Sequence, residues 1–303
     1  MQWQSGSLWS RLKTQSAHGL RIGALQPIET ALEQIDSGGM RFIVRVLAHL
    51  SQKEKARRQQ ARAQQVGMNP TNPFLPYEND LYVCDISPTH LCLLNKFNVV
   101  DHHFLIVTRQ FEPQENWLTL ADFEALTKCL AETDGLAFFN GGKVAGASQP
   151  HKHLQVIPYL DGLTAFPIDQ LIMLAPAQAD GVMRSPLLAF RHAMLPIEMD
   201  AKATTLTWQP SAQQLLISYR RLLRAVKISE TPDWKGIQTM AYNFLCTRQW
   251  MMVVPRSQEK YAGISVNALG FAGSLLVKNQ AGLKQLQAIG PMNLLQQVGC
   301  SAQ

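Results

Sequence analysis

The sequence between positions 141 and 155 places a glycine-rich turn directly before the alternating segment His-Lys-His-Leu-Gln. Successive side chains of an extended strand point to opposite faces, so His151, His153 and Gln155 share one face, and the lysine and leucine between them share the other. Glycines allow the preceding loop to approach a ligand closely through its backbone. The stretch therefore predicts a β-strand that presents two imidazoles and an amide beside a ligand-binding loop.

The segments around this stretch predict an antiparallel α+β unit. Short apolar runs with close connections are typical of antiparallel strands, because a parallel crossover needs a longer link. One segment with helical spacing interrupts them, with Thr119 as its N-cap and Asp122 three residues later. We expect strands at 81–85, 91–97, 103–108, 136–139 and 151–158, and a helix at 119–133 that ends at Gly135.

Outside this unit the pattern predicts mixed elements. We expect short helices at 7–14 and 27–35, a strand at 40–50, a long helix at 211–228 and a hairpin formed by 239–246 and 250–254. The proline-rich residues 160–210 are expected to be partly irregular. We divide the chain into an N-terminal basic region (1–75), a catalytic core (76–160) and a C-terminal region that completes the site (161–303), together one compact unit.

The positive charge of the chain is concentrated in one segment. The 303 residues carry a net charge of +6, and residues 41–65 alone hold seven basic side chains against one acidic one. This favours an anionic partner. Residues 51–65 are polar all round, which fits either a solvated helix or a basic flap over phosphates.

The remaining composition predicts an ordinary cytoplasmic protein. Five scattered cysteines without a paired motif indicate reduced thiols. The first ten residues contain no apolar run typical of a signal peptide, and no later segment is long and apolar enough to span a membrane.

The residue types of the His-x-His-x-Gln segment favour nucleotidyl transfer. A neutral imidazole can attack an α-phosphorus and form a covalent nucleotidyl-histidine, provided that its other ring nitrogen is held as a donor. His153 lies deeper in its strand, where a neighbouring strand can fix the ring, so we assign it as the nucleophile; His151, at the loop edge, is assigned to the phosphate or leaving group. Gln155 cannot shuttle a proton at neutral pH, which favours transfer or phosphorolysis over hydrolysis. Metal-binding or merely packed histidines are the alternative, although no cysteine pair or nearby carboxylate completes a zinc site.

Several ordered blocks resemble one known family. The segment His151–Gln155, preceded by Gly-Ala-Ser-Gln at 146–149, is similar to the transferase branch of the histidine-triad (HIT-like) superfamily. It resembles most closely the ATP adenylyltransferases, also called diadenosine tetraphosphate phosphorylases. The supporting blocks are Leu94–Phe97, Phe139–Gly142, Asn243–Thr247, Trp250–Met251 and Val254–Arg256, so the resemblance extends from about residue 41 to about residue 256.

This resemblance implies a HIT-like antiparallel sheet and a reversible two-step reaction. His153 would displace ATP from diadenosine tetraphosphate, Gln155 would contact the adenylyl-histidine, and phosphate would then take the AMP to give ADP. The substrate-binding residues that the resemblance implies are Lys53, Asn95, Lys96, Asn140, Gly146, Ala147, Ser148, Gln149, Leu245, Cys246, Thr247, Met252 and Arg256. It implies no protein metal site and no tightly bound cofactor, only a divalent cation (Mg) that arrives with the polyphosphate.

The expected partners are therefore small molecules: a dinucleoside polyphosphate, ATP, ADP and phosphate. We expect a monomer with no nucleic-acid or membrane partner. A sugar-1-phosphate uridylyltransferase shares the His-x-His-x-Gln segment but usually has structural metal ligands. A non-catalytic RNA- or nucleotide-binding protein could use the basic segment, although it lacks interleaved aromatic residues for base stacking.

Overall fold

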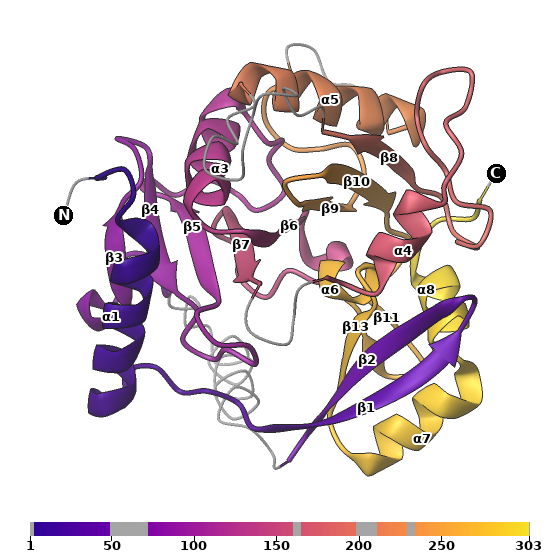
Figure 1. The fold of residues 1–303 in the computed structure, drawn as a ribbon, viewed down its shortest axis with the longest axis horizontal. Helices are drawn as coiled ribbons and strands as arrows, with labels where there is room; N and C mark the ends of the chain where they lie inside the picture. Colours follow the sequence, from indigo (N-terminus) through magenta and orange to yellow (C-terminus); the bar gives the residue numbers. More distant parts are fainter. Residues whose placement is uncertain (1–2, 49–71, 160–164, 198–210, 229–233, 303) are drawn as a thin grey trace, which may run out of the picture.

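An eight-stranded antiparallel sheet forms the centre of the molecule (Figure 1). The computed structural model describes residues 3–48, 72–159, 165–197, 211–228 and 234–302. The strand order β3-β4-β5-β7-β6-β9-β10-β8 places β7 near the middle of the sheet, where neighbouring strands hold it on both edges. The strands are β3 (Tyr82–Asp85), β4 (His90–Leu94), β5 (Phe104–Thr108), β6 (Gly135–Asn140), β7 (His153–Pro158), β8 (Ala193–Pro196), β9 (Tyr242–Cys246) and β10 (Trp250–Pro255).

Three helices cover one face of this sheet. They are α1 (Leu8–Ile22), α3 (Leu120–Glu132) and α5 (Ala212–Ala225), and their apolar sides share one buried cluster with Leu154 of β7. Two of the helices begin with reciprocal caps: Thr119 with Asp122 opens α3, and Ser211 with Gln214 opens α5. Strand β7 is therefore packed from behind by a large helical layer.

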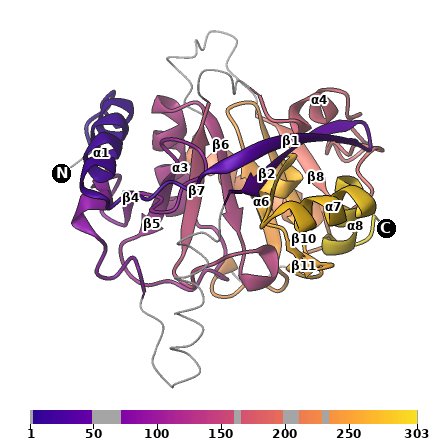
Figure 2. The same cartoon turned by 90° about the horizontal axis from the view of Figure 1, so that it is seen from below.

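A second layer packs on part of the opposite face. Strands β1 (Thr30–Ser37), β2 (Met40–Leu47) and β13 (Ser274–Val277) form a small sheet, in which β13 runs parallel to β2. Phe42 and Val44 of β2 share a buried cluster with Phe138 and Leu245 of the large sheet, and Figure 2 shows β1 and β2 crossing in front of its central strands. The other elements are α4 (Ile168–Met173), α6 (Ala268–Phe271), α7 (Gln280–Ile289), α8 (Pro291–Val298), the pair β11 (Lys260–Tyr261) and β12 (Ile264–Ser265), and the 3-10 turns at Asn79–Leu81 and Lys143–Ala145.

The α+β class and the strand–helix order of residues 76–160 are confirmed, as are the helix α5 and the β9–β10 hairpin. The strand predicted at 40–50 is β2, which ends at Leu47. The predicted helix at 27–35 is wrong. Most of that segment is β1, which pairs with β2 through a turn at Gly38 and Gly39, whose φ angles of 59° and 77° suit a hairpin. Gly19 lies inside α1, which ends at Gly23, and Gly135 starts β6 rather than ending α3.

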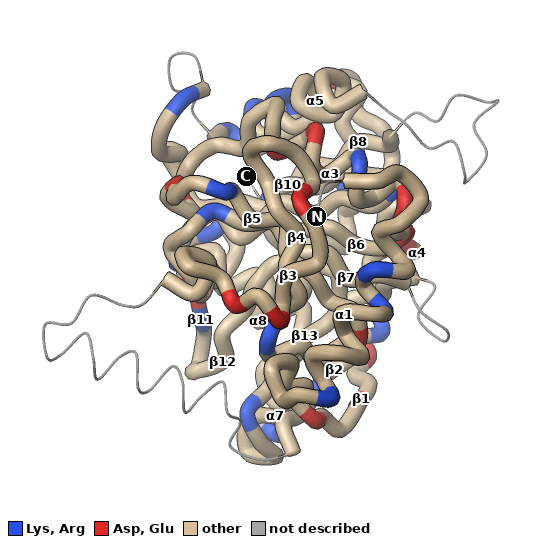
Figure 3. The backbone as a smooth tube through the Cα atoms, turned by 90° about the vertical axis from the view of Figure 1, so that its left-hand side faces the viewer, with Lys and Arg blue, Asp and Glu red and all other residues tan. Residues whose placement is uncertain are grey.

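Most of the basic segment lies outside the described residues. Within the described part, basic and acidic residues are interspersed along the backbone (Figure 3). Residues 51–65, expected to form a flap or a solvated helix, lie outside the described part. No helix in the described ranges has the length and apolarity needed to cross a membrane.

Candidate active site

The ring of His153 is buried at the start of β7, and one of its nitrogens has a defined role. Its Nδ1–H donates to the carbonyl of His151 over 2.8 Å, which leaves Nε2 as the nitrogen with the lone pair. Within the described residues, Nε2 has no hydrogen-bond partner. Burial lowers the pKa of this imidazole to about 4, so the ring is neutral at pH 7. A neutral ring with a fixed tautomer has the properties required of a nitrogen nucleophile.

His151 has a different environment from the one we predicted. Its Nε2–H donates to the backbone carbonyl of Thr108 at 2.8 Å and also faces that of Gln110 at 3.1 Å, while Nδ1 accepts from Asn72 at 3.0 Å. The residue is fully buried, and Phe74 and Phe111 pack edge-on against the ring. Since both nitrogens are engaged by the protein, the structure does not present this ring to a phosphate, and His151 holds the loop edge in place.

Gln114 holds the start of β7 and was not predicted from the sequence. Its Oε1 accepts from the backbone N–H of His153 at 2.8 Å, and its Nε2 donates to the carbonyls of Asn140 at 2.9 Å and His153 at 3.2 Å. The side chain thereby joins the last residue of β6 to the first residue of β7. No local pattern marks a glutamine that acts across three segments, so only the structure reveals it.

Gln155 lies on the same face as His153, as the strand alternation predicts. Its Oε1 is 3.1 Å from Nε2 of His103, and the other ring nitrogen of His103 is 3.1 Å from Nδ2 of Asn95. Asn95 therefore contacts His103, and its link to Gln155 runs through that histidine. His103, the second residue that sequence reasoning missed, immediately precedes β5, which pairs with β7.

Lys152 projects to the opposite face, where it is buried in an ion pair. Its Nζ is 2.7 Å from Oδ2 of Asp122 and 3.2 Å from Oε2 of Glu112. His90 contacts the other carboxylate oxygen of Asp122 at 3.1 Å. Burial raises the pKa of the Asp122 carboxyl, but the charge of Lys152 and the hydrogen bond with His90 outweigh it and hold that pKa below its usual value. The lysine between the two histidines thus anchors the strand to α3.

The glycine loop forms a tight turn in which some backbone N–H groups donate to carbonyls of the same loop. Gly146 adopts φ +89°, and a Cβ there would lie 2.7 Å from the carbonyl oxygen of Val266, so a side chain is excluded. The N–H groups of Gly146 and Ala147 donate to carbonyls of the loop itself. Among the described residues, the N–H groups of Ser148 and Gln149 have no partner. The predicted phosphate cradle is therefore reduced to these last two amides.

Asn140 and Arg256 belong to the frame behind this loop. Asn243 donates to Oδ1 of Asn140 and to the carbonyl of Ala145, both at 2.8 Å. The buried Arg256 guanidinium donates to Oδ1 of Asn243 at 2.7 Å and to the carbonyls of Ala145 and Val266 at 3.2 and 2.9 Å. It also donates to Val298, Gln258 and Glu259. A phosphate contact by Arg256 is not supported, because its donors are already used to fix the loop.

Comparison with known proteins agrees with this arrangement. Residues 1–174 match the model of the Ap4A phosphorylase N-terminal domain, and residues 186–301 match that of the ATP adenylyltransferase C-terminal domain. The chain belongs to the Ap4A phosphorylase family.

Two yeast proteins are similar to this family member in sequence. Diadenosine 5',5'''-P1,P4-tetraphosphate phosphorylase 2 of Saccharomyces cerevisiae is 30% identical over 218 residues, which are 64% of this chain and 64% of that protein. Protein APA1 of the same yeast is 28% identical over 205 residues, which are 62% and 61% of the two chains. The matched region spans less than two thirds of either relative.

Solved structures show the same fold over the whole chain. Yeast Ap4A phosphorylase Apa2 in complex with AMP has a TM-score of 0.78 and 23% identity, covering 100% of this chain and 99% of that one. The complex of Apa2 with Ap4A has the same TM-score at 22% identity and covers 99% of both chains. The α+β fold with a large antiparallel sheet, expected from the sequence, is thus shown.

The other predicted substrate residues of this family member are not all near His153. Leu245 and Met252 lie in the row of paired residues that crosses the sheet from Gln155 through Phe138, so they share its face. Cys246 points into the helical layer on the opposite face, and the Thr247 hydroxyl accepts from Gln249 and Trp250 in the hairpin turn. Neither is placed for a contact with a ligand at His153.

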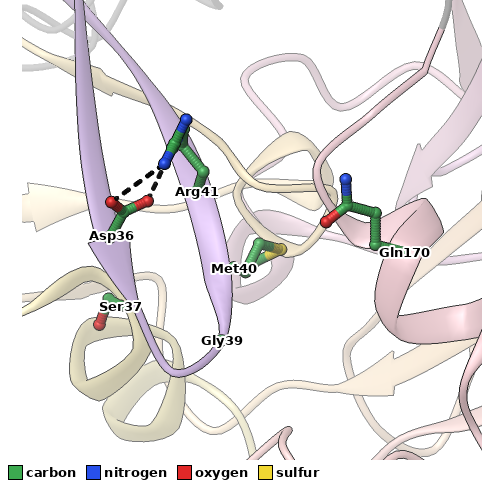
Figure 4. A pocket seen from close by; sticks show the side chains of 6 residues that line it. All are labelled: Asp36, Ser37, Gly39, Met40, Arg41 and Gln170. Carbon is green, nitrogen blue, oxygen red and sulfur yellow. Dashed lines mark hydrogen bonds and ion pairs between the residues drawn. The ribbon is translucent and has the colours of Figure 1, made fainter.

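Two predicted lysines also lack a described place in the site. Lys96 forms an ion pair with Glu78 at 2.8 Å in a partly exposed position, and Lys53 lies outside the described residues. A separate cavity of about 410 Å³ lies at the tip of the β1–β2 hairpin beside α4, lined by Arg41, Asp36 and Gln170 among others (Figure 4). None of the predicted site residues lines that cavity, so it is not the predicted catalytic site.

Proposed function

We propose that this chain catalyses the reversible phosphorolysis of diadenosine tetraphosphate, giving ADP and ATP through an adenylyl-histidine. Nε2 of His153 attacks an α-phosphorus, a P–N bond forms, and the bond from that phosphorus to the bridging oxygen breaks as ATP leaves. An oxygen of inorganic phosphate then attacks the same phosphorus, the P–N bond breaks, and ADP is released. The observation that carries the proposal is the buried, neutral His153, whose Nδ1–H is held by the His151 carbonyl at 2.8 Å.

The neighbouring groups support transfer to phosphate over transfer to water. Gln155 offers an amide and cannot act as a general base toward water at neutral pH. The amides of Ser148 and Gln149 are loop donors that no described acceptor uses, so they can serve phosphoryl oxygens. The yeast relative named diadenosine tetraphosphate phosphorylase 2 and the Apa2 complexes with AMP and Ap4A point to the same substrate class.

The proposal also covers the oligomeric state, compartment and cofactor requirement of the enzyme. We propose a cytoplasmic monomer that acts on small molecules and has no tightly bound cofactor; any divalent cation arrives with the polyphosphate. The five cysteines, all free thiols, fit a reducing compartment.

The test is to incubate the purified protein with diadenosine tetraphosphate, with and without phosphate, and to separate the nucleotides. With phosphate we expect repeated turnover that gives equal amounts of ADP and ATP; without phosphate we expect no ADP and at most one ATP per enzyme molecule, released as the adduct forms. Brief exposure without phosphate, followed by digestion at neutral or alkaline pH because a P–N bond is labile in acid, should place an AMP adduct on the peptide that contains His153. AMP production that does not require phosphate, or an adduct on another residue, would contradict the proposal.

A further inference from the structure

His103 immediately precedes β5 and contacts Gln155 on the face of the sheet that carries His153, although it lies outside the predicted motif. The side chain is 5% exposed and its ring lies 6.0 Å from that of Phe138, on the face that carries Gln155. Its backbone carbonyl accepts from the N–H of Asn95 at 2.9 Å, which extends the β4–β5 ladder by one residue. Because β5 also pairs with β7, the ring is held at a fixed distance from Gln155.

The hydrogen bonds around this ring connect three side chains in a series, and each bond has a defined donor and acceptor. Asn95 presents Nδ2, a donor, to Nδ1 of His103 at 3.1 Å, so that nitrogen accepts and carries no proton. The proton of the neutral ring then lies on Nε2, which faces Oε1 of Gln155 at 3.1 Å. Each bond thus has one donor and one acceptor, running from Asn95 through His103 to Gln155.

The direction of these hydrogen bonds decides which end of the Gln155 amide is free to contact a ligand. Its oxygen is used by His103, so the amide presents its NH2 group to the remaining space. Within the described residues no acceptor contacts that NH2 group, and Gln155 is only partly buried. A phosphoryl oxygen is an acceptor, and a donor aimed at it is worth more than a freely rotating amide, which would half the time present its own oxygen.

We propose that His103 is a positioning residue: its Nε2–H donates to Oε1 of Gln155 and fixes the side-chain amide so that the NH2 group faces the phosphoryl group at His153. The proposal rests on the function proposed above for its kinetic consequence, but the direction of the hydrogen bonds stands independently of the substrate.

The kinetic test is a double-mutant cycle with His103→Phe, Gln155→Ala and both together. Phenylalanine keeps an aromatic ring beside Phe138 and removes the donor. We expect each single change to lower kcat about 10- to 100-fold with KM changed less than about threefold, as for loss of one transition-state donor. The double variant should be no slower than Gln155→Ala, because His103 acts through Gln155; losses that multiply would overturn the proposal.

His102→Asn is the matched control. His102 is adjacent in the chain, but its ring contacts Ser16 and Trp9 on α1, and asparagine tolerates its φ of 56°. We expect wild-type turnover from this variant. A loss equal to that of His103→Phe would assign the effect to the turn as a whole.

A second measurement keeps the proposal testable if the variants do not fold or the substrate is wrong. Long-range ¹H–¹⁵N NMR correlations of the wild-type imidazoles report which ring nitrogen carries the proton. We expect Nε2 of His103 to be protonated and Nδ1 to be unprotonated. The opposite tautomer would reverse the direction of the hydrogen bonds and overturn the proposal. If the wild-type protein shows the expected tautomer but no phosphorolysis, only the proposed function is overturned.

Discussion

His153 is buried at the start of β7, and its Nδ1–H is donated to a carbonyl two residues earlier in the same chain. Burial disfavours the charged form of the ring, and the carbonyl selects the tautomer, so two ordinary features of a strand start give His153 the properties that the proposed nucleophile needs. His151 supplies the carbonyl, yet its own ring is engaged by Thr108, Gln110 and Asn72. The two histidines of the motif therefore have different roles: the ring of His151 is held by the protein, and His153 keeps one ring nitrogen without a partner among the described residues.

The first prediction concerns pH. Because burial lowers the pKa of His153 from its ordinary value of 6.5 to about 4, we expect the acid limb of the phosphorolysis rate that belongs to this residue to lie near pH 4. The unfolded chain takes up the proton at the ordinary value, so the stability contributed by the neutral ring is present above pH 6.5 and is lost as the pH falls toward 4. Rates from pH 4 to 8, with recovery checked on return to pH 7, measure this; an acid limb of His153 at its ordinary pKa would contradict it.

The second prediction separates the two histidines. His153→Ala removes the attacking nitrogen, and we expect turnover to fall about 10⁴-fold or more. His151→Ala leaves the backbone carbonyl in place but orphans the buried groups around the ring, so we expect a loss of about 1–3 kcal/mol in the free energy of unfolding and about tenfold in turnover. Steady-state rates and urea denaturation of both variants measure this. Equal loss of turnover would mean that both rings take part in the chemistry.

At the scale of elements, the strand β7 is anchored by the buried ion pair of Lys152 and Asp122 behind it. The Lys152 side chain is 0% exposed and that of Asp122 is 1% exposed, and Asp122 also caps α3 through the N–H of Thr119 at 2.6 Å. One carboxylate thus joins the strand that carries His153 to the helix that covers the sheet. Such pairs are costly to break one partner at a time, because the other charge remains buried.

The third prediction follows from this coupling. Asp122→Asn should lower the free energy of unfolding by about 3–5 kcal/mol, because Lys152 retains only the more exposed Glu112 as a charged partner. Glu78→Gln is the matched control: it breaks a pair of similar length, 2.8 Å, with Lys96, but the two side chains are 47% and 32% exposed. We expect a change of about 1 kcal/mol or less there. Urea denaturation of both variants decides whether burial makes the difference.

The sequence predicted elements well where one local pattern decides the structure. The capping box of Thr119 and Asp122, the alternation of β7 and the β9–β10 hairpin were all found in this way. The segment 27–35 was misassigned because its partner strand, not its own pattern, makes it extended. For the same reason Gln114, His103 and Asn243 were missed, and Arg256 was given to the substrate although six protein groups accept from it.

At the scale of the whole molecule, the two family-matched segments are interleaved. Strand β9 of the second segment pairs with β6 of the first, so the eight-stranded sheet contains strands from both. The small sheet is shared as well, since β13 of the second segment pairs with β2 of the first. The glycine loop of residues 141–146 is held from behind by Asn243 and Arg256, which also come from the second segment.

The fourth prediction is that neither segment folds alone. Residues 1–174 would expose the edge of β6 and the apolar face of β2, and unpaired edges with apolar faces promote aggregation. We expect residues 1–174 and 175–303 to be insoluble or to lack a cooperative unfolding transition when produced separately, and to co-purify with measurable activity when produced together. Circular dichroism melting of each piece and of the co-purified pair measures this. A sharp transition in residues 1–174 alone would show instead that the segment that carries His153 is an independent folding unit, and that the second segment only supports its glycine loop.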